Sequence, residues 1–114
     1  MIPDEGIREI LKRYTTVAVV GLSRNPSKDS YEVAEYLQSR GYRIVPINPV
    51  ADEILGEKSY GSLLELSEEL KRSVEIVDLF RPSEAVLPFV EDAIKLREEY
   101  GVPEVIWMQL GIVN

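Results

Sequence analysis

The chain has 114 residues, a formal net charge of −7, and neither cysteine nor histidine. Disulfides, cysteine nucleophiles and metal sites built on cysteine or histidine are therefore excluded, and the negative charge argues against a nucleic-acid-binding surface. No apolar run approaches the roughly 20 residues that span a bilayer, and the N-terminus lacks the apolar segment of a signal peptide. We expect one cytoplasmic domain without membrane or nucleic-acid partners.

The first half of the chain predicts a helix, a strand and a second helix. Apolar residues at helical spacing predict an opening helix from Pro3 to Tyr14. Val17–Val20 is a short apolar run typical of a strand buried on both faces, and Gly21 marks the turn that ends it. The next helix is expected from Tyr31 onward, just after Asp29 and Ser30.

Two signals bound that second helix. Asp29 and Glu32 have capping-box spacing, and Ser30 is nearly as good an N-cap. Gly41 is expected to stop the helix. A strand followed by a glycine turn and a helix N-terminus directs backbone N–H groups and the positive helix dipole to one point, which favours phosphate binding. Arg24 and Lys28 add positive charge in the same loop.

The remaining elements alternate between strands and helices. Strands are predicted at Tyr42–Ile47, Val74–Phe80 and Val105–Gln109, with the N–H side of Pro46 facing away from a partner strand. Residues 50–60 look irregular, with a turn at Leu55-Gly56, a short edge strand near Lys58–Tyr60, and helical turns at 62–66 and 67–72. A helix starts near Ser83, carries Pro88 in its first turn, ends at Gly101 and buries Val86, Phe89, Val90, Ala93 and Ile94.

This order of elements predicts the fold class. It is typical of a Rossmann-like, doubly wound parallel α/β sheet in three α/β/α layers, forming a single domain with strand order 3-2-1-4-5. In such open sheets, ligands bind at the carboxyl ends of the strands.

The sequence lacks the motifs of two common nucleotide-binding sites, which limits the nucleotides that could bind at this edge. The turn at residues 21–26 lacks the later glycines of a G-x-G-x-x-G dinucleotide turn, and no Gly-Lys-Ser or Gly-Lys-Thr forms a P-loop. The second long strand ends at Asn48-Pro49, where an NAD site places an acidic residue. NAD is therefore disfavoured.

Four segments carry a family resemblance: VAVVGLSRNPSKDSYEVAEYLQSRGYRIVPINP, LGEKSYGSL, VDLFRPSE and WMQLGIVN. Together they resemble the stand-alone CoA-binding domain family, single-domain relatives of the N-terminal domain of the succinyl-CoA synthetase alpha subunit. The resemblance implies a Rossmann-like fold over residues 1–114, coenzyme A at the carboxyl edge of the sheet, and no established catalytic activity. Family members usually continue past this last segment, so we expect the chain to lack a C-terminal helix and strand.

The resemblance also implies a set of cofactor-binding residues. The turn at Gly21, Leu22, Ser23 and Arg24 would wrap the pyrophosphate, together with Lys28 and the N–H groups of Ser30 and Tyr31. Asn48 and Pro49 would line the adenosine end, Phe80 and Arg81 would form a wall beside the nucleotide, and Met108, Gln109 and Leu110 would face the pantetheine arm. Trp107 is assigned to the core, and Asp78, inside an apolar strand, is expected to hydrogen-bond the turn after Gly21.

Without histidine or cysteine, no catalytic pair stands out on the expected ligand edge. The sequence therefore favours a non-catalytic module that binds coenzyme A or an acyl-CoA. Such a module would act as a sensor or a carrier of this small-molecule ligand. Two alternatives stay open. One is an NAD(P)-binding oxidoreductase fragment, and the other is an interaction protein with a vestigial nucleotide site.

Overall fold

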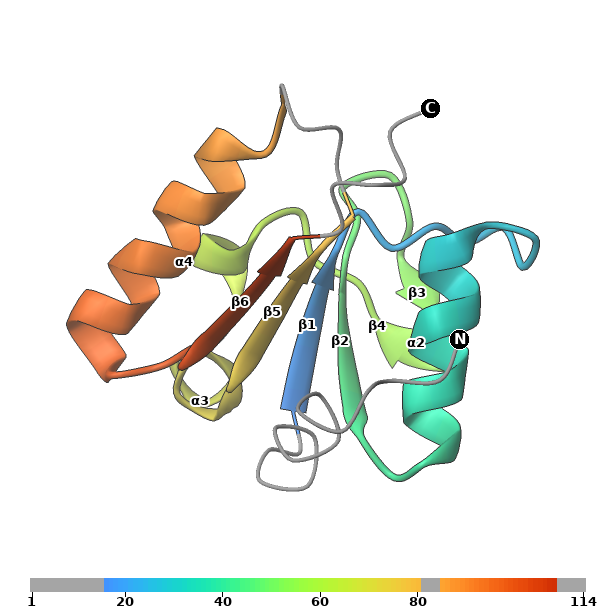
Figure 1. Ribbon diagram of the computed structural model, residues 1–114, viewed down its shortest axis with the longest axis horizontal. Coiled ribbons are helices and arrows are strands. Elements are labelled where there is room, and N and C mark those ends of the chain that lie inside the picture. The colour runs from blue at the N-terminus through green and yellow to red at the C-terminus, as the bar shows by residue number, and fades with distance from the viewer. Residues whose placement is uncertain (1–15, 81–84, 109–114) are drawn as a thin grey trace.

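A central parallel sheet organises the computed structural model, which describes residues 16–80 and 85–108. Its four strands lie in the order β2-β1-β5-β6, and each neighbouring pair is parallel. In Figure 1 these four strands run in the same direction, toward one edge of the sheet. The strand bounds are β1 Thr16–Val20, β2 Arg43–Ile47, β5 Ile76–Leu79 and β6 Val105–Met108. The prediction of an α/β doubly wound sheet is confirmed.

The central strand β1 is buried along its whole length. Val17 is in register with Ile44 of β2 on one side and with Ile76 of β5 on the other. A run of small and β-branched side chains suits a strand that has helices on both faces, because no side is left for solvent. Beyond β2, a single parallel bridge joins Ile47 to Tyr60, which places the predicted short edge strand where the sequence indicated.

Helix α2 spans Asp29–Ser39 and follows β1. Its C-terminal end matches the prediction: Gly41 has φ +95°, its N–H donates to the carbonyl of Gln38, and the N–H of Tyr42 donates to that of Leu37. These two bonds form a Schellman motif, which satisfies carbonyls that the helix leaves open.

The predicted capping box of α2 is wrong. Lys28 occupies the N-cap position without a side-chain cap bond, and Asp29 is already the first helical residue. The hydroxyl of Ser30 accepts from a backbone N–H in the preceding loop instead. The helix therefore begins one residue earlier than a side-chain cap at Asp29 requires.

A small hairpin interrupts the stretch that was predicted to be irregular. β3 Glu53–Ile54 pairs antiparallel with β4 Glu57–Lys58, and the turn between them has Leu55 at φ 55° and Gly56 at φ 78°. Two consecutive residues with positive φ are the mark of a type I′ hairpin turn. The turn at Leu55-Gly56 was predicted correctly, but its strands are too short to show an alternating pattern. The amide of Gln38 donates to the carbonyl of Leu55 and ties the hairpin to α2.

The other face of the sheet carries the 3₁₀ turn η1 Leu63–Glu65 and the helices α3 Glu68–Ser73 and α4 Leu87–Tyr100. Ser67 caps α3 through its hydroxyl, and Gly101 ends α4 with φ +81°, as predicted. Pro88 lies in the first turn of α4, also as predicted. The expected burial of Ile94 is wrong: its side chain is 45% exposed, whereas Leu96 is 1% exposed.

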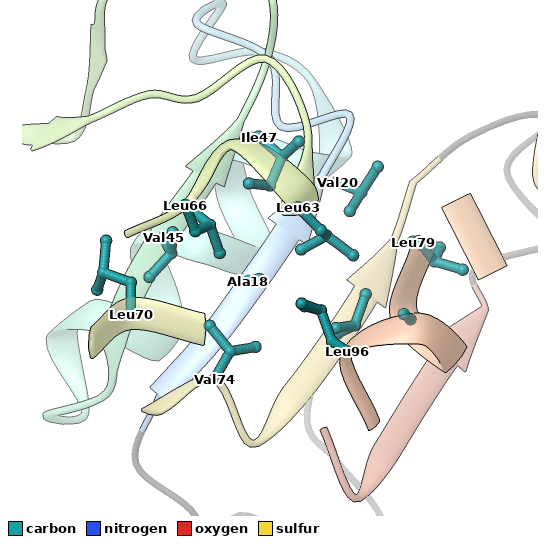
Figure 2. Close-up of a cluster of buried hydrophobic side chains, with 12 residues drawn as sticks. Ala18, Val20, Val45, Ile47, Leu63, Leu66, Leu70, Val74, Leu79 and Leu96 are labelled. Carbon is teal, nitrogen blue, oxygen red and sulfur yellow. The ribbon is translucent and has the colours of Figure 1, made fainter. Parts of the chain in front are cut away.

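Two hydrophobic clusters cover the two faces of the sheet and confirm the three layers. On one face, α2 and the β3–β4 hairpin pack over Val17 and Val19 of β1, Ile44 of β2 and Ile76 of β5. Figure 2 shows the other face, where residues of η1, α3 and α4 lie against β1, β2 and β5. The labelled members of this second cluster are Ala18, Val20, Val45, Ile47, Leu63, Leu66, Leu70, Val74, Leu79 and Leu96.

Some predicted features differ in extent or lie outside the described part of the chain. β5 is shorter than the predicted Val74–Phe80, although the N–H of Phe80 still donates to the carbonyl of Val20. The opening helix at 3–14 and the helix start near Ser83 lie outside the described residues. Within residues 16–80 and 85–108, no helix combines the length and the apolar character needed to cross a bilayer.

Candidate ligand-binding site

The carboxyl ends of β1 and β2 meet at Gly21. Its N–H donates to the carbonyl of Ile47 at 3.0 Å, and its φ of +83° turns the chain out of the sheet. Glycine suits this position because a side chain disfavours that backbone conformation. From there the chain runs over the tips of the strands toward α2 (Figure 1). The turn after β1 therefore lies at the edge where open α/β sheets bind ligands.

The loop between this turn and α2 is held by its own hydrogen bonds. The N–H of Ser23 donates to the hydroxyl of Ser30 at 2.9 Å, and the N–H of Asn25 donates to the hydroxyl of Ser23 at 3.0 Å. The side-chain oxygen of Asn25 accepts from the N–H of Ser27, and its carbonyl accepts from that of Lys28. These bonds occupy four backbone N–H groups of the loop, including that of Ser23 in the turn that the resemblance placed around the pyrophosphate.

The first turn of α2 provides the open donors. Its first intrahelical bond runs from the N–H of Glu32 to the carbonyl of Lys28, and no acceptor in the described chain takes the N–H groups of Asp29, Ser30 and Tyr31. Helix N-termini carry a partial positive charge that attracts anions. The N–H groups of Asp29, Ser30 and Tyr31 are thus open donors at the N-terminus of α2, beside the turn after β1.

Charged side chains around this helix end have opposing effects. Arg24 and Lys28 are exposed in the loop and bring cations to a chain whose net charge is −7. Asp29 and Glu32 place two carboxylates in the first turn of α2. These carboxylates interact favourably with the helix dipole but repel an anionic ligand, and the charges of Arg24 and Lys28 oppose that repulsion.

Asn48 links the two strand ends through its side chain. Its Nδ2 donates to the carbonyl of Leu22 at 3.0 Å, and its Oδ1 accepts from the N–H of Val50 at 2.9 Å. The hydroxyl of Ser59 donates to its carbonyl at 2.9 Å. Sequence reasoning placed Asn48 at the adenosine end and missed this bonding. The Asn-Pro dipeptide is a signal for an Asx turn, but the bond to Leu22 depends on strand pairing.

The other expected site residues differ in accessibility. Leu22 and Phe80 are 0% and 7% exposed and belong to the hydrophobic cluster under α2, so Leu22 offers only its backbone to a ligand. Tyr31 is half-buried against the same cluster, and Pro49 is exposed. Met108 is 48% exposed at the end of β6. The remaining members of the set lie outside the described residues: Arg81, Gln109 and Leu110.

Asp78 and Trp107 lie side by side in register on β5 and β6. Asp78 is 1% exposed, and Trp107 is half-buried and packs on the cluster under α2, as expected for a core residue. The expected bond between Asp78 and the turn after Gly21 stays a prediction.

No catalytic or metal-binding arrangement emerges from the described residues. Residues 16–80 and 85–108 hold no group of three or more acidic side chains suited to a metal ion. Burial raises the pKa of the Tyr42 hydroxyl and of the Asp92 carboxyl. Neither residue is among the expected site residues.

Known proteins have sequences and structures similar to those of this chain. The model of a family described as CoA binding domain matches residues 15–114. The uncharacterized protein YneT of Bacillus subtilis is 41% identical over 108 residues, which cover 95% of this chain and 73% of YneT. The ADP-forming acetate–CoA ligase of Methanocaldococcus jannaschii is 36% identical over 62 residues, or 54% of this chain and 9% of the ligase.

A solved structure extends the similarity to three dimensions. The crystal structure of Prb, a PH1109 protein redesigned for binding, superposes with a TM-score of 0.77 and is 40% identical. The match covers 95% of this chain and 70% of that one. Since the family model spans nearly all of the sequence and the fold agrees, the chain belongs to the CoA-binding domain family.

Proposed function

We propose that this protein binds coenzyme A or an acyl-CoA at the carboxyl edge of its sheet, as a binding or sensor module without catalytic activity of its own. Membership of the CoA-binding domain family is the observation that carries the proposal. The similarity of 62 residues to an acetate–CoA ligase supports it, because that enzyme's name includes coenzyme A.

The geometry supports a particular orientation of the ligand. Its pyrophosphate would lie at the N–H groups of Ser30 and Tyr31, between the side chains of Arg24 and Lys28. Hydrogen bonds to charged groups contribute about 1.5–3 kcal/mol each, so this contact would supply much of the affinity. The adenosine would then extend past the end of β2 toward the exposed Pro49, and the pantetheine arm toward Met108 at the end of β6.

The absence of histidine and cysteine from the sequence supports a non-catalytic role. Histidine is the commonest general base, and cysteine is the strongest natural nucleophile among the side chains. A module that only binds would report the level of its ligand through another protein. We place this role in the cytoplasm, where coenzyme A would be available.

The test is calorimetric titration of the full chain with coenzyme A, dephospho-CoA, ADP and NAD in parallel. We expect micromolar binding of coenzyme A, weaker binding of dephospho-CoA because it lacks the 3′-phosphate, and about tenfold weaker coenzyme A binding for Arg24→Ala or Lys28→Ala. Arg43→Ala is the matched control, since Arg43 is an exposed cation at the opposite end of β2. It should bind like the wild type.

Other outcomes would contradict the proposal. Binding of NAD in preference to coenzyme A would favour a dinucleotide-dependent oxidoreductase fragment. No heat with any nucleotide would favour an interaction protein. Equal losses for Arg43→Ala and Arg24→Ala would show that only the total charge matters and would remove the site from this loop.

A further inference from the structure

Three separate segments meet at Asn48. Its backbone N–H donates to the carbonyl of Tyr60 at 2.8 Å, and its carbonyl accepts from the hydroxyl of Ser59 at 2.9 Å. Its side chain reaches Val50, two residues later, and Leu22, 26 residues earlier. The backbone of Asn48 thus bonds to the segment at the edge of the sheet, while its side chain bonds to the turn after β1.

The orientation of the Asn48 amide follows from its partners. The carbonyl of Leu22 can only accept and the N–H of Val50 can only donate, so the Nδ2 atom must face Leu22 and the Oδ1 atom must face Val50. The two atoms perform separate tasks. Oδ1 holds an Asx turn, which a carboxylate would hold equally well, whereas only an amide provides the donor to Leu22.

The bond to Leu22 completes the restraint of the turn. The Leu22 side chain is fully buried in the core, its carbonyl is held by Asn48, and the next N–H, that of Ser23, is held by Ser30. A peptide restrained at its side chain, its carbonyl and the following N–H has little freedom to rotate. The direction in which the chain enters α2, and hence the placement of the donors at Ser30 and Tyr31, depends on this restraint.

We propose that Asn48 is a positioning residue for the anion-binding turn and acts through its amide donor rather than by contacting the ligand. The inference rests on the proposed function, since it assigns to Asn48 a role in the affinity for coenzyme A. It replaces the role that the family resemblance implied, a lining of the adenosine end. It also gives a physical reason for an amide at the end of β2, where a carboxylate would face the Leu22 carbonyl without a donor.

The test compares Asn48→Asp with Asn48→Ala and Ser59→Ala in the full chain. Asn48→Asp keeps the acceptor for Val50 and removes the donor to Leu22, whereas Asn48→Ala removes both without adding charge. Ser59→Ala is the matched control, because it removes the bond to the Asn48 carbonyl and leaves the bond to Leu22 intact. Thermal melting verifies that each variant is folded.

Two readouts separate positioning from direct contact. Titration with coenzyme A should give about tenfold weaker binding for both Asn48 variants and a change of less than about twofold for Ser59→Ala. In ¹⁵N-correlated NMR spectra without ligand, Asn48→Asp should shift the amide resonances of Gly21, Leu22 and Ser23 beyond the shifts that Ser59→Ala produces. A positioning role moves these resonances before any ligand is added.

The outcomes are distinguishable. Weaker coenzyme A binding with unmoved turn resonances would overturn positioning and favour a direct contact with the ligand. Wild-type affinity in both Asn48 variants would overturn the inference and leave the proposed function standing. Failure of the wild type itself to bind coenzyme A would overturn the proposed function, and with it a role for Asn48 in binding, before any substitution is compared.

Discussion

The hydroxyl oxygen of Ser30, in the first turn of α2, accepts a hydrogen bond from the N–H of Ser23 at 2.9 Å. Ser30 is only 6% exposed, so the bond lies in a protected position. It closes the seven-residue interval between the turn after β1 and the helix that follows. The loop that carries Arg24 and Lys28 is therefore fixed at both ends before a ligand arrives.

Removing this bond should affect both stability and binding. Ser30→Ala leaves the half-buried N–H of Ser23 without its acceptor, which should lower the free energy of unfolding by about 1 kcal/mol. It should also weaken coenzyme A binding, because the loop becomes less ordered. Urea denaturation and calorimetric titration measure the two effects. Ser39→Ala removes an exposed hydroxyl on the same helix and should change neither by a comparable amount; equal effects of the two variants would contradict the prediction.

The two faces of α4 should respond differently to truncation. Leu96 is 1% exposed in the core between α4 and the sheet, so Leu96→Ala should lower the free energy of unfolding by about 2–5 kcal/mol. Ile94 is 45% exposed, and Ile94→Ala should cost less than about 1 kcal/mol. Chemical denaturation measures the loss in free energy of unfolding for each variant. A larger loss for Ile94→Ala would mean that α4 is rotated from the orientation described.

The glycine after α2 should be required for its backbone conformation rather than for space. Gly41 has φ +95°, and an added Cβ would meet nothing within 4 Å. Gly41→Ala should therefore lower the free energy of unfolding by about 1 kcal/mol, because alanine disfavours the left-handed backbone conformation. At Gly61 an added Cβ would meet the Glu65 carboxylate at 2.7 Å, but that exposed side chain can move. The free energy of unfolding of Gly61→Ala should therefore stay within about 0.5 kcal/mol of that of the wild type. Urea denaturation of both glycine variants measures the difference.

The Asp92 carboxyl should contribute a pH dependence of stability. Burial is the main cause of its raised pKa, with the Lys95 charge lowering it and the Glu91 charge raising it. A raised pKa in the folded state means that the folded state binds the proton more tightly than the unfolded state. The resulting stabilisation is complete below the ordinary carboxyl pKa of 3.8 and is lost as the pH rises through the folded-state pKa.

Asp92→Asn removes the charged form that burial disfavours, so the variant should be more stable than the wild type at neutral pH. This advantage should shrink as the pH falls toward 4. Urea denaturation at several pH values measures it. Glu98→Gln makes the same change in net charge at an exposed position of α4 and controls for the general relief of charge repulsion. An equal gain for both variants would show that Asp92 has no specific effect.

Much of the fold was predictable because its signals are local. The apolar run Val17–Val20 and the glycines at 21, 41 and 101 each describe the conformation of their own immediate neighbourhood. The β3–β4 hairpin was not predicted, because a strand of two residues is too short to show the alternation of apolar and polar side chains. The burial of α4 was misjudged at Ile94 because several apolar faces are compatible with the same helical spacing, and only the packing against the sheet selects one of them.

The sequence by itself determined the alternation of strands and helices, the parallel sheet, and the loop in which cations and a helix N-terminus coincide. These properties follow from side-chain periodicity and from the conformational preferences of glycine and proline. Tertiary structure decided which partners the polar groups take. The hydroxyl of Ser30 accepts from the N–H of Ser23 instead of capping its helix. The side-chain amide of Asn48 donates to the carbonyl of Leu22, which the pairing of β1 with β2 brings within reach. Such bonds depend on where distant segments meet, because a polar side chain takes the partner that folding brings within reach.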